Sequence, residues 1–207
     1  MAGEESGGSV FSSVVPALVP VATELLARLA GGAPLVVGPE IDLGIRLAYE
    51  RPADLGPDRI ADAVAGWAAA KGGAVLVVDF GTATTFNAVT AEGVFLGGAI
   101  AAGLLTAAEA VARRGARLFE PDLRFPARVI GRSTEECLRS GALWGAAALV
   151  DGMIEKMKKE MGGACTIATG GLATFVAPRC AAVDLVDEDL TLKGLMLLYE
   201  RNRKRSR

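Results

Sequence analysis

Runs of apolar residues with two different periods divide the chain into strands and helices. Four apolar, mostly β-branched residues occupy positions 75–78, and such a run predicts a strand that is buried on both faces. Residues 17–29 and the segment that begins at Asp58 carry apolar residues at helical spacing, which predicts amphipathic helices. Strands that alternate with helices predict an α/β protein whose ligand lies at the carboxyl ends of the strands.

The same patterns predict the remaining elements. Short strands are expected at 9–16, 35–37, 85–89, 94–100, 166–168 and 183–186, and helices at 104–118, 135–161, 172–176 and 191–203. Residues 38–57 and 119–130 contain glycines or prolines without periodicity, so we expect loops there. In the helix at 135–161, Gly141, Gly145 and Ala148 permit close approach of a neighbouring helix. Charged residues interrupt that helix, which predicts a buried or subunit-interface helix and no membrane span.

A turn with phosphate-binding character follows the central strand. Asp79 stands near the end of the strand, and residues 81–85 form the glycine- and threonine-rich stretch GTATT. Glycine lets a backbone approach an anion, threonine hydroxyls and turn amides donate to phosphate oxygens, and a carboxylate beside them can hold a cation. The alternative interpretation is an ordinary β-turn next to a capping aspartate.

Composition narrows the possible chemistry. The chain has no histidine, which excludes Ser-His-Asp and Cys-His sites and histidine-ligated metals and leaves acid–base work to carboxylates, lysines or tyrosines. It also lacks the GxxxxGK[ST], GxGxxG and GxSxG motifs. One carboxylate of interest is Asp58, which opens a predicted helix; it is either a helix N-cap or a functional group.

Charge and cysteine content bear on partners and location. The net charge is −2, which argues against nucleic-acid binding, and we interpret the basic tail at 201–207 as a solvated helix end. Cys137, Cys165 and Cys180 stand far apart without a CxxC pair, which favours a reducing cytoplasm and argues against structural zinc. Residues 1–8 are polar and acidic, unlike a signal peptide, and we expect them to be a disordered tail.

Seven short motifs, in this order, give the chain a family resemblance. They are SSVVP at Ser12, GPDR at Gly56, DFGTATTF at Asp79, LGGAIAAG at Leu96, ST at Ser133, ATGG at Ala168 and LTLKGL at Leu190. From about Ser9 to Asn202 the chain resembles the type III pantothenate kinases. The resemblance implies an actin-like, ribonuclease H-like (ASKHA) fold of two related domains, a dimer, and transfer of the γ-phosphoryl group of ATP to pantothenate. Mild departures from the family pattern are Pro57, Ala102 and Ser133.

The resemblance implies a role for each matching residue. Asp58 would be the general base, Tyr49, Gly56, Pro57 and Arg59 would line the pantothenate site with it, and Thr134 would bind pantothenate across the dimer interface. Asp79 would ligate a monovalent cation, K⁺, and the expected cofactors are ATP, Mg²⁺ and K⁺. The ATP-binding residues would be Gly81, Thr82, Thr169, Gly170 and Gly171. Phosphoryl transfer suits such a site because it needs positioning and charge neutralisation more than a strong base.

One departure is severe. The printed sequence contains no DxGNT motif, the family's first phosphate loop, so we expect an incomplete first domain at 9–73, a complete second domain at 74–200 and a basic tail at 201–207. Three explanations are open: a subunit that completes its site with a full-length relative in a heterodimer or heterotetramer, a non-catalytic regulatory or scaffold relative, or a truncated sequence. A sugar or acetate kinase would not explain GPDR with DFGTATTF. Alone, the chain is expected to have little or no kinase activity.

Overall fold

The computed structural model describes residues 8–114 and 123–203. Most of the predicted N-terminal tail, the last part of the basic tail, the end of the helix expected at 104–118 and the start of the loop expected at 119–130 lie outside the described residues. Within the described ranges, no helix is long and apolar enough to cross a membrane.

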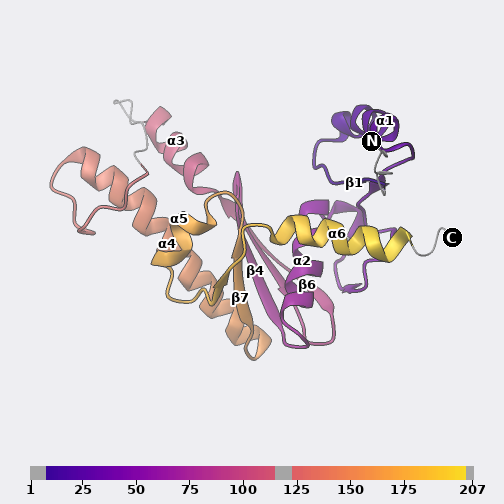
Figure 1. Ribbon diagram of the computed structural model, residues 1–207. Helices are drawn as coiled ribbons and strands as arrows, with labels where there is room; N and C mark the ends of the chain where they lie inside the picture. Colours follow the sequence, from indigo (N-terminus) through magenta and orange to yellow (C-terminus); the bar gives the residue numbers. More distant parts are fainter. Residues whose placement is uncertain (1–7, 115–122, 204–207) are drawn as a thin grey trace, which may run out of the picture.

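A six-stranded sheet forms the centre of the molecule (Figure 1). The strands run β3, β6, β5, β4, β7, β8 across it, with bounds β3 Arg46–Leu47, β4 Val75–Phe80, β5 Ala83–Val89, β6 Val94–Ala102, β7 Cys165–Thr169 and β8 Leu185–Val186. β5 is antiparallel to β4 and β6, while β7 is parallel to β4 and to β8. From β4 to β8 this is the ribonuclease H-like order, third, second, first, fourth, fifth, with only the second strand reversed. The expected actin-like α/β fold is therefore confirmed.

Side-chain alternation along β4 divides the core into two clusters. Val75 and Val77 pack on one face with the helices α2 (Pro57–Ala69) and α6 (Leu190–Arg203). Leu76, Val78 and Phe80 pack on the other face with α4 (Thr134–Met161) and α5 (Ala173–Val176). Because helices cover both faces, the whole apolar run is buried, as the sequence predicts.

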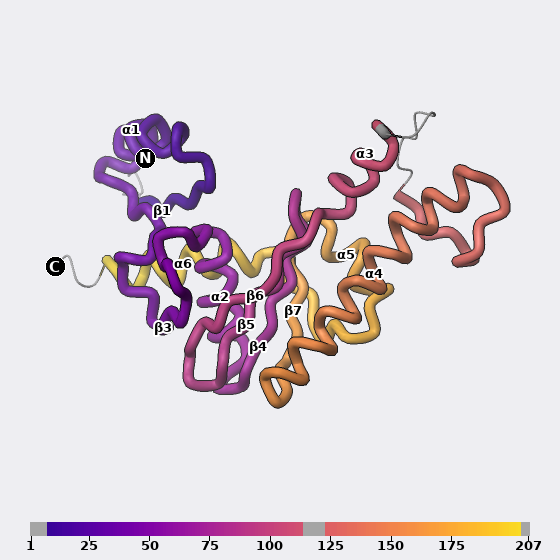
Figure 2. Tube along the Cα trace, turned by 180° about the vertical axis from the view of Figure 1, so that it is seen from behind, coloured from indigo at the N-terminus to yellow at the C-terminus, as the bar shows by residue number. Residues whose placement is uncertain are grey.

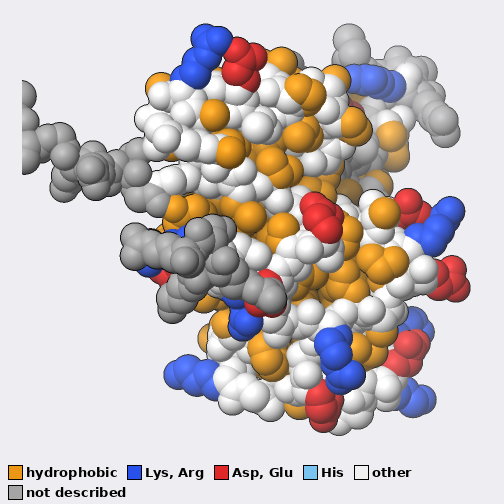
Figure 3. Space-filling view, turned by 90° about the vertical axis from the view of Figure 1, so that its right-hand side faces the viewer, with side chains coloured by type: hydrophobic (Ala, Val, Ile, Leu, Met, Phe, Trp, Pro, Cys, Tyr) orange, Lys and Arg blue, Asp and Glu red, His pale blue; other side chains and the backbone are white. Residues whose placement is uncertain are grey.

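The N-terminal part is a separate, smaller layer. β1 (Val10–Phe11) and β2 (Leu35–Val36) form a parallel pair, and the chain between them passes through the short helix η1 (Pro16–Leu18) into α1 (Val19–Ala30). No residue of α1 is fully buried, and its apolar stripe is exposed at Val21, Leu25 and Leu29. Figure 3 shows hydrophobic side chains spread among few charged ones on this side of the molecule. The domain boundary at residue 74 stays a prediction.

Two local expectations are wrong. The loop expected at 38–57 contains the edge strand β3 and the short helix η2 (Pro52–Asp54). The phosphate-binding turn is shorter than expected, because residues 83–85 belong to β5 and only Gly81 and Thr82 connect β4 to β5. The strand β3 forms by pairing with β6, at Arg46 with Val94, and residues 83–85 pair with β6 and also with the end of β4. In both segments strand pairing overrides local turn composition.

Candidate functional site

A cavity of about 600 Å³ lies at the start of α2. Its wall contains five residues predicted for the substrate site, namely Tyr49, Gly56, Pro57, Asp58 and Arg59. The structure adds lining residues that the sequence did not single out: Ser13, Val14, Pro16, Val19, Ala53, Asp54, Leu55, Ala83, Thr85 and Ile100. Most of these additions lie within the motifs SSVVP, DFGTATTF and LGGAIAAG, although the sequence assigned none of them to the substrate site. Only the fold shows that these separate segments meet in one cavity. The cavity combines apolar walls with a few convergent polar groups, which is typical of small-molecule sites.

Asp58 does not cap its helix. The N-cap of α2 is Gly56, with Pro57 at the first helical position, and the Asp58 carboxylate accepts a hydrogen bond from the Arg59 backbone N–H at 2.9 Å. Proline is favoured at a first helical position because its missing N–H is not needed there. The capping interpretation of Asp58 is therefore wrong, and the carboxylate remains part of the cavity wall.

Arg59 holds the start of α2 against the sheet. Its side chain is only 6% exposed, and its Nε donates to the Oδ1 of Asn87 on β5 at 2.7 Å. The guanidinium also lies 5.7 Å from the centre of the Phe95 ring on β6, within the range of a cation–π interaction. Asn87 is fully buried, and the sequence did not predict it as a site residue. Its hydrogen bond to Arg59 joins residues 28 positions apart, so no local pattern indicates it.

The predicted phosphate-binding residues gather at the carboxyl ends of β4 and β7. Asp79 on β4 lies opposite Thr169 on β7, and the turn Gly81–Thr82 follows directly after β4. Gly170 has a φ of +92°, and a Cβ there would overlap the Asp79 carboxylate and the Phe80 backbone. The strand ends thus bring together residues 90 positions apart, at the edge where α/β sheets bind ligands.

Asp79, at the end of β4, interacts electrostatically with Asp58 in the cavity wall. Burial raises the pKa of the Asp79 carboxyl, and the negative charge of Asp58 raises it further. The Asp79 carboxylate suits a hard cation, because such cations prefer oxygen ligands. A positive charge there would also offset the repulsion between Asp58 and Asp79. Among residues 8–114 and 123–203, no group of three or more acidic or cysteine residues forms a metal cluster.

Thr134 lies apart from the other predicted site residues. It is the first residue of α4, next to the N-cap Ser133, whose hydroxyl accepts a hydrogen bond from the Glu136 N–H at 3.2 Å. It does not line the cavity, and Figure 2 shows the start of α4 at the opposite end of the molecule from α2. A role for Thr134 in pantothenate binding therefore needs a second subunit, and that role stays a prediction.

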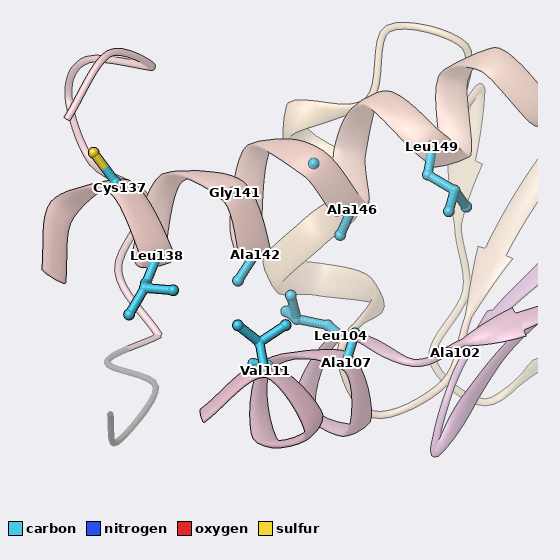
Figure 4. A pocket seen from close by; sticks show the side chains of 12 residues that line it. Ala102, Leu104, Ala107, Val111, Cys137, Leu138, Gly141, Ala142, Ala146 and Leu149 are labelled. Carbon is cyan, nitrogen blue, oxygen red and sulfur yellow. The ribbon is translucent and has the colours of Figure 1, made fainter. Parts of the chain in front are cut away.

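A second cavity, of about 420 Å³, lies between α3 (Leu104–Arg114) and α4 (Figure 4). Leu104, Val111 and Leu138 point into it, and no carboxylate or amine lines it. A Cβ added at Gly141 or Gly145 would meet nothing within 4 Å, so no helix of the described chain packs closely there. This apolar cavity lacks groups for acid–base or phosphate chemistry.

The sheet order, together with a cavity whose few polar groups converge beside glycine turns at the strand ends, defines an actin-like α/β protein with a candidate phosphotransfer site. A family model described as type III pantothenate kinase matches residues 1–156. The chain belongs to the type III pantothenate kinase family.

Individual relatives agree with this assignment. The type III pantothenate kinase of Moorella thermoacetica is 44% identical over 200 residues, which cover 96% of this chain and 78% of that protein. The one from Thermomicrobium roseum is 46% identical, over 94% of this chain and 75% of that protein. Among solved structures, a Campylobacter jejuni protein named for the Baf family of transcriptional activators has a TM-score of 0.63 and 21% identity, covering 92% of this chain and 81% of its own. That last likeness supports the fold alone.

Gly170→Ala is expected to weaken ATP binding by about tenfold or more. The added Cβ would displace the Asp79 carboxylate, and an L-residue at this φ carries roughly 1–3 kcal/mol of strain. Isothermal titration calorimetry with Mg-ATP measures the loss. Gly152→Ala is the matched control, since a Cβ there meets open space. Equal affinities of the two variants would contradict the prediction that Gly170 belongs to the ATP site.

Proposed function

We propose that this chain phosphorylates pantothenate at its 4′ hydroxyl, with ATP as the donor, in the first step of coenzyme A biosynthesis. The observation that carries the proposal is the cavity itself, which unites all four residues of GPDR with Tyr49 and adjoins the Asp79 edge. Family membership supports the same substrate pair.

The proposed roles follow from this arrangement. Asp58 accepts the proton of the pantothenate hydroxyl. The oxygen of that hydroxyl bonds to the γ-phosphorus of ATP, and the bond between this phosphorus and the ADP oxygen breaks. Tyr49, Gly56, Pro57 and Arg59 line the pantothenate site. The buried Arg59–Asn87 hydrogen bond supports this, because it keeps the start of α2 in one position.

ATP is proposed to bind at the strand ends through Gly81, Thr82, Thr169, Gly170 and Gly171. Asp79 is proposed as the ligand of a monovalent cation, K⁺, and its raised pKa supports this because a nearby cation would favour the charged carboxylate. When bound, Mg²⁺ with ATP supplies charge neutralisation on the phosphates. The protein's own contribution is to position the hydroxyl, the base and the nucleotide.

The proposed assembly is a dimer in which Thr134 completes the pantothenate site of the opposite subunit. The position of Thr134 outside the cavity of its own chain supports this. We further propose that the chain forms a homodimer, or a heterodimer or heterotetramer in which a full-length relative carrying the DxGNT loop completes the ATP site. A cytoplasmic location is proposed as well, supported by three cysteines that are all free thiols.

A coupled assay of ATP-dependent pantothenate phosphorylation, with Mg²⁺ and K⁺, tests the function. The purified chain is assayed alone and after mixing with a full-length type III relative whose own Asp base has been changed to Asn. Activity that appears only in the mixture is the expected result, because the partner then contributes its phosphate loop and this chain its base. Absence of activity in every combination would contradict the proposed function and favour a regulatory role.

A further inference from the structure

A buried carboxyl lies directly behind the proposed base. Asp62 stands four residues after Asp58, one turn along the same face of α2, and its side chain is fully buried. The Thr191 hydroxyl of α6 donates a hydrogen bond to its Oδ1 at 2.6 Å. Its other oxygen, Oδ2, has no hydrogen-bond partner among the described residues. A buried acidic side chain with one unpaired oxygen is costly, so its presence here calls for a physical explanation.

The hydrogen bond belongs to an unusually close helix contact. Gly194, one turn after Thr191 on α6, lies so near the Ala61 backbone that a Cβ at this position would overlap it. Leu198, one turn further, is fully buried in the same cluster as Ile60 and Val64. The LTLKGL motif therefore has a structural role: its threonine and glycine fix α6 directly on α2, with the Thr191–Asp62 hydrogen bond as the polar contact.

The charges around Asp62 disfavour its ionised form. Burial raises its pKa to about 7, and the charges of Asp79 on β4 and Asp58 on α2 act in the same direction. The hydrogen bond from Thr191 and the charge of Arg59 act against them. An uncharged carboxylic acid can still accept the Thr191 hydrogen bond through its carbonyl oxygen, and it adds no third negative charge beside Asp58 and Asp79.

We propose that Asp62 is a positioning residue that accepts the Thr191 hydrogen bond and thereby holds α6 against the first two turns of α2. Those turns carry Asp58 and Arg59, so the contact sets the position of the cavity wall from behind. This inference rests on the proposed function where it concerns pantothenate, but the helix contact itself can be tested without any ligand.

Hydrogen exchange of the full chain, followed by mass spectrometry on peptides from α2, tests the contact. Thr191→Val keeps the shape of the side chain and removes the donor, leaving a buried acceptor unpaired. We expect amide exchange in the first two turns of α2 to rise by about fivefold or more. Thr191→Ser restores the hydroxyl and is expected to return exchange to near the wild-type rate. Asp62→Asn, which is neutral and keeps the acceptor, is expected to leave exchange in α2 at neutral pH within about twofold of wild type.

Val150→Ala separates positioning from general destabilisation. Val150 is buried in the other hydrophobic cluster, on the opposite face of the sheet, and its truncation destabilises the fold without touching α2. Pantothenate affinity, measured by calorimetry, is expected to fall about fivefold in Thr191→Val and to stay unchanged in Val150→Ala.

Three results would overturn the inference: equal exchange in α2 for Thr191→Val and Val150→Ala, no rescue by serine, or an Asp62→Asn variant that exchanges as fast as Thr191→Val. Failure of wild-type protein to bind pantothenate would count against the proposed function instead. In that case the exchange data still decide the role of Asp62.

Discussion

Asp58→Asn is expected to lower the rate of pantothenate phosphorylation by a factor of about 10² to 10⁴, the usual range for loss of a general base. In the wild type, the Arg59 backbone N–H donates a hydrogen bond to the Asp58 Oδ1 at 2.9 Å. Asparagine has the same shape and keeps an oxygen that can accept this hydrogen bond. The helix does not depend on Asp58 for capping, because Gly56 is the N-cap. The substitution therefore removes proton acceptance and leaves the cavity wall in place.

A steady-state assay of the mixture with the full-length relative, in which activity is expected, separates the effect on the chemical step from the effect on pantothenate binding. We expect kcat to carry most of the loss, with a small change in the KM for pantothenate, since the base acts mainly in the transition state. Glu155→Gln removes one negative charge from an exposed position on α4 and serves as the control for net charge. An Asp58→Asn enzyme with at least half of the wild-type kcat would show that Asp58 is not the base.

Asp62→Asn is expected to change how stability depends on pH. In the folded chain the pKa of Asp62 is raised from 3.8 to about 7, so the folded state retains a proton that the unfolded state has lost. The contribution of Asp62 to the free energy of unfolding is therefore most favourable below pH 4, falls as the pH rises toward about 7, and levels off above it. A pKa difference of about 3 corresponds to roughly 4 kcal/mol as an upper limit.

The asparagine side chain does not ionise, so Asp62→Asn removes the loss of stability that the raised pKa of Asp62 causes at high pH. Its unpaired buried amide costs roughly 1–3 kcal/mol, so we expect a net gain of about 1–3 kcal/mol at pH 8. The advantage over wild type should shrink by roughly 2–3 kcal/mol between pH 8 and pH 5.

Urea unfolding at several pH values, followed by circular dichroism, measures the difference between the two proteins. K⁺ is omitted because a cation near Asp79 would offset part of the charge that raises the pKa of Asp62. Glu155→Gln, whose carboxylate is exposed, should give a curve parallel to wild type. A constant offset between Asp62→Asn and wild type across the pH range would mean that Asp62 is already ionised in the folded chain.

Several elements could be predicted from the sequence because their signals are local. The apolar run of β4 and the helical spacing in α2 and α6 are properties of neighbouring residues, and the structure confirms them. The strands β5 and β6 were also predicted, at 85–89 and 94–100, although β5 begins earlier than expected, at Ala83, and β6 ends later, at Ala102. GPDR and DFGTATTF are short contiguous motifs, so family membership too could be inferred from adjacent residues.

The contacts that complete the site depended on the tertiary structure. Asn87 meets Arg59, and Thr191 meets Asp62 across 129 positions; neither partner stands near the other in the sequence. Asp62 looks like an ordinary polar position of an amphipathic helix, and only the packing of α6 shows that it is buried. Local propensity and short motifs are properties of adjacent residues, so the sequence alone determined the main helices, the central strands and the family, but not the edge strand β3. Burial and charge environment arise from the sum of distant contacts, so only the folded chain decided which carboxylates share one site and which of them has its pKa raised most by burial.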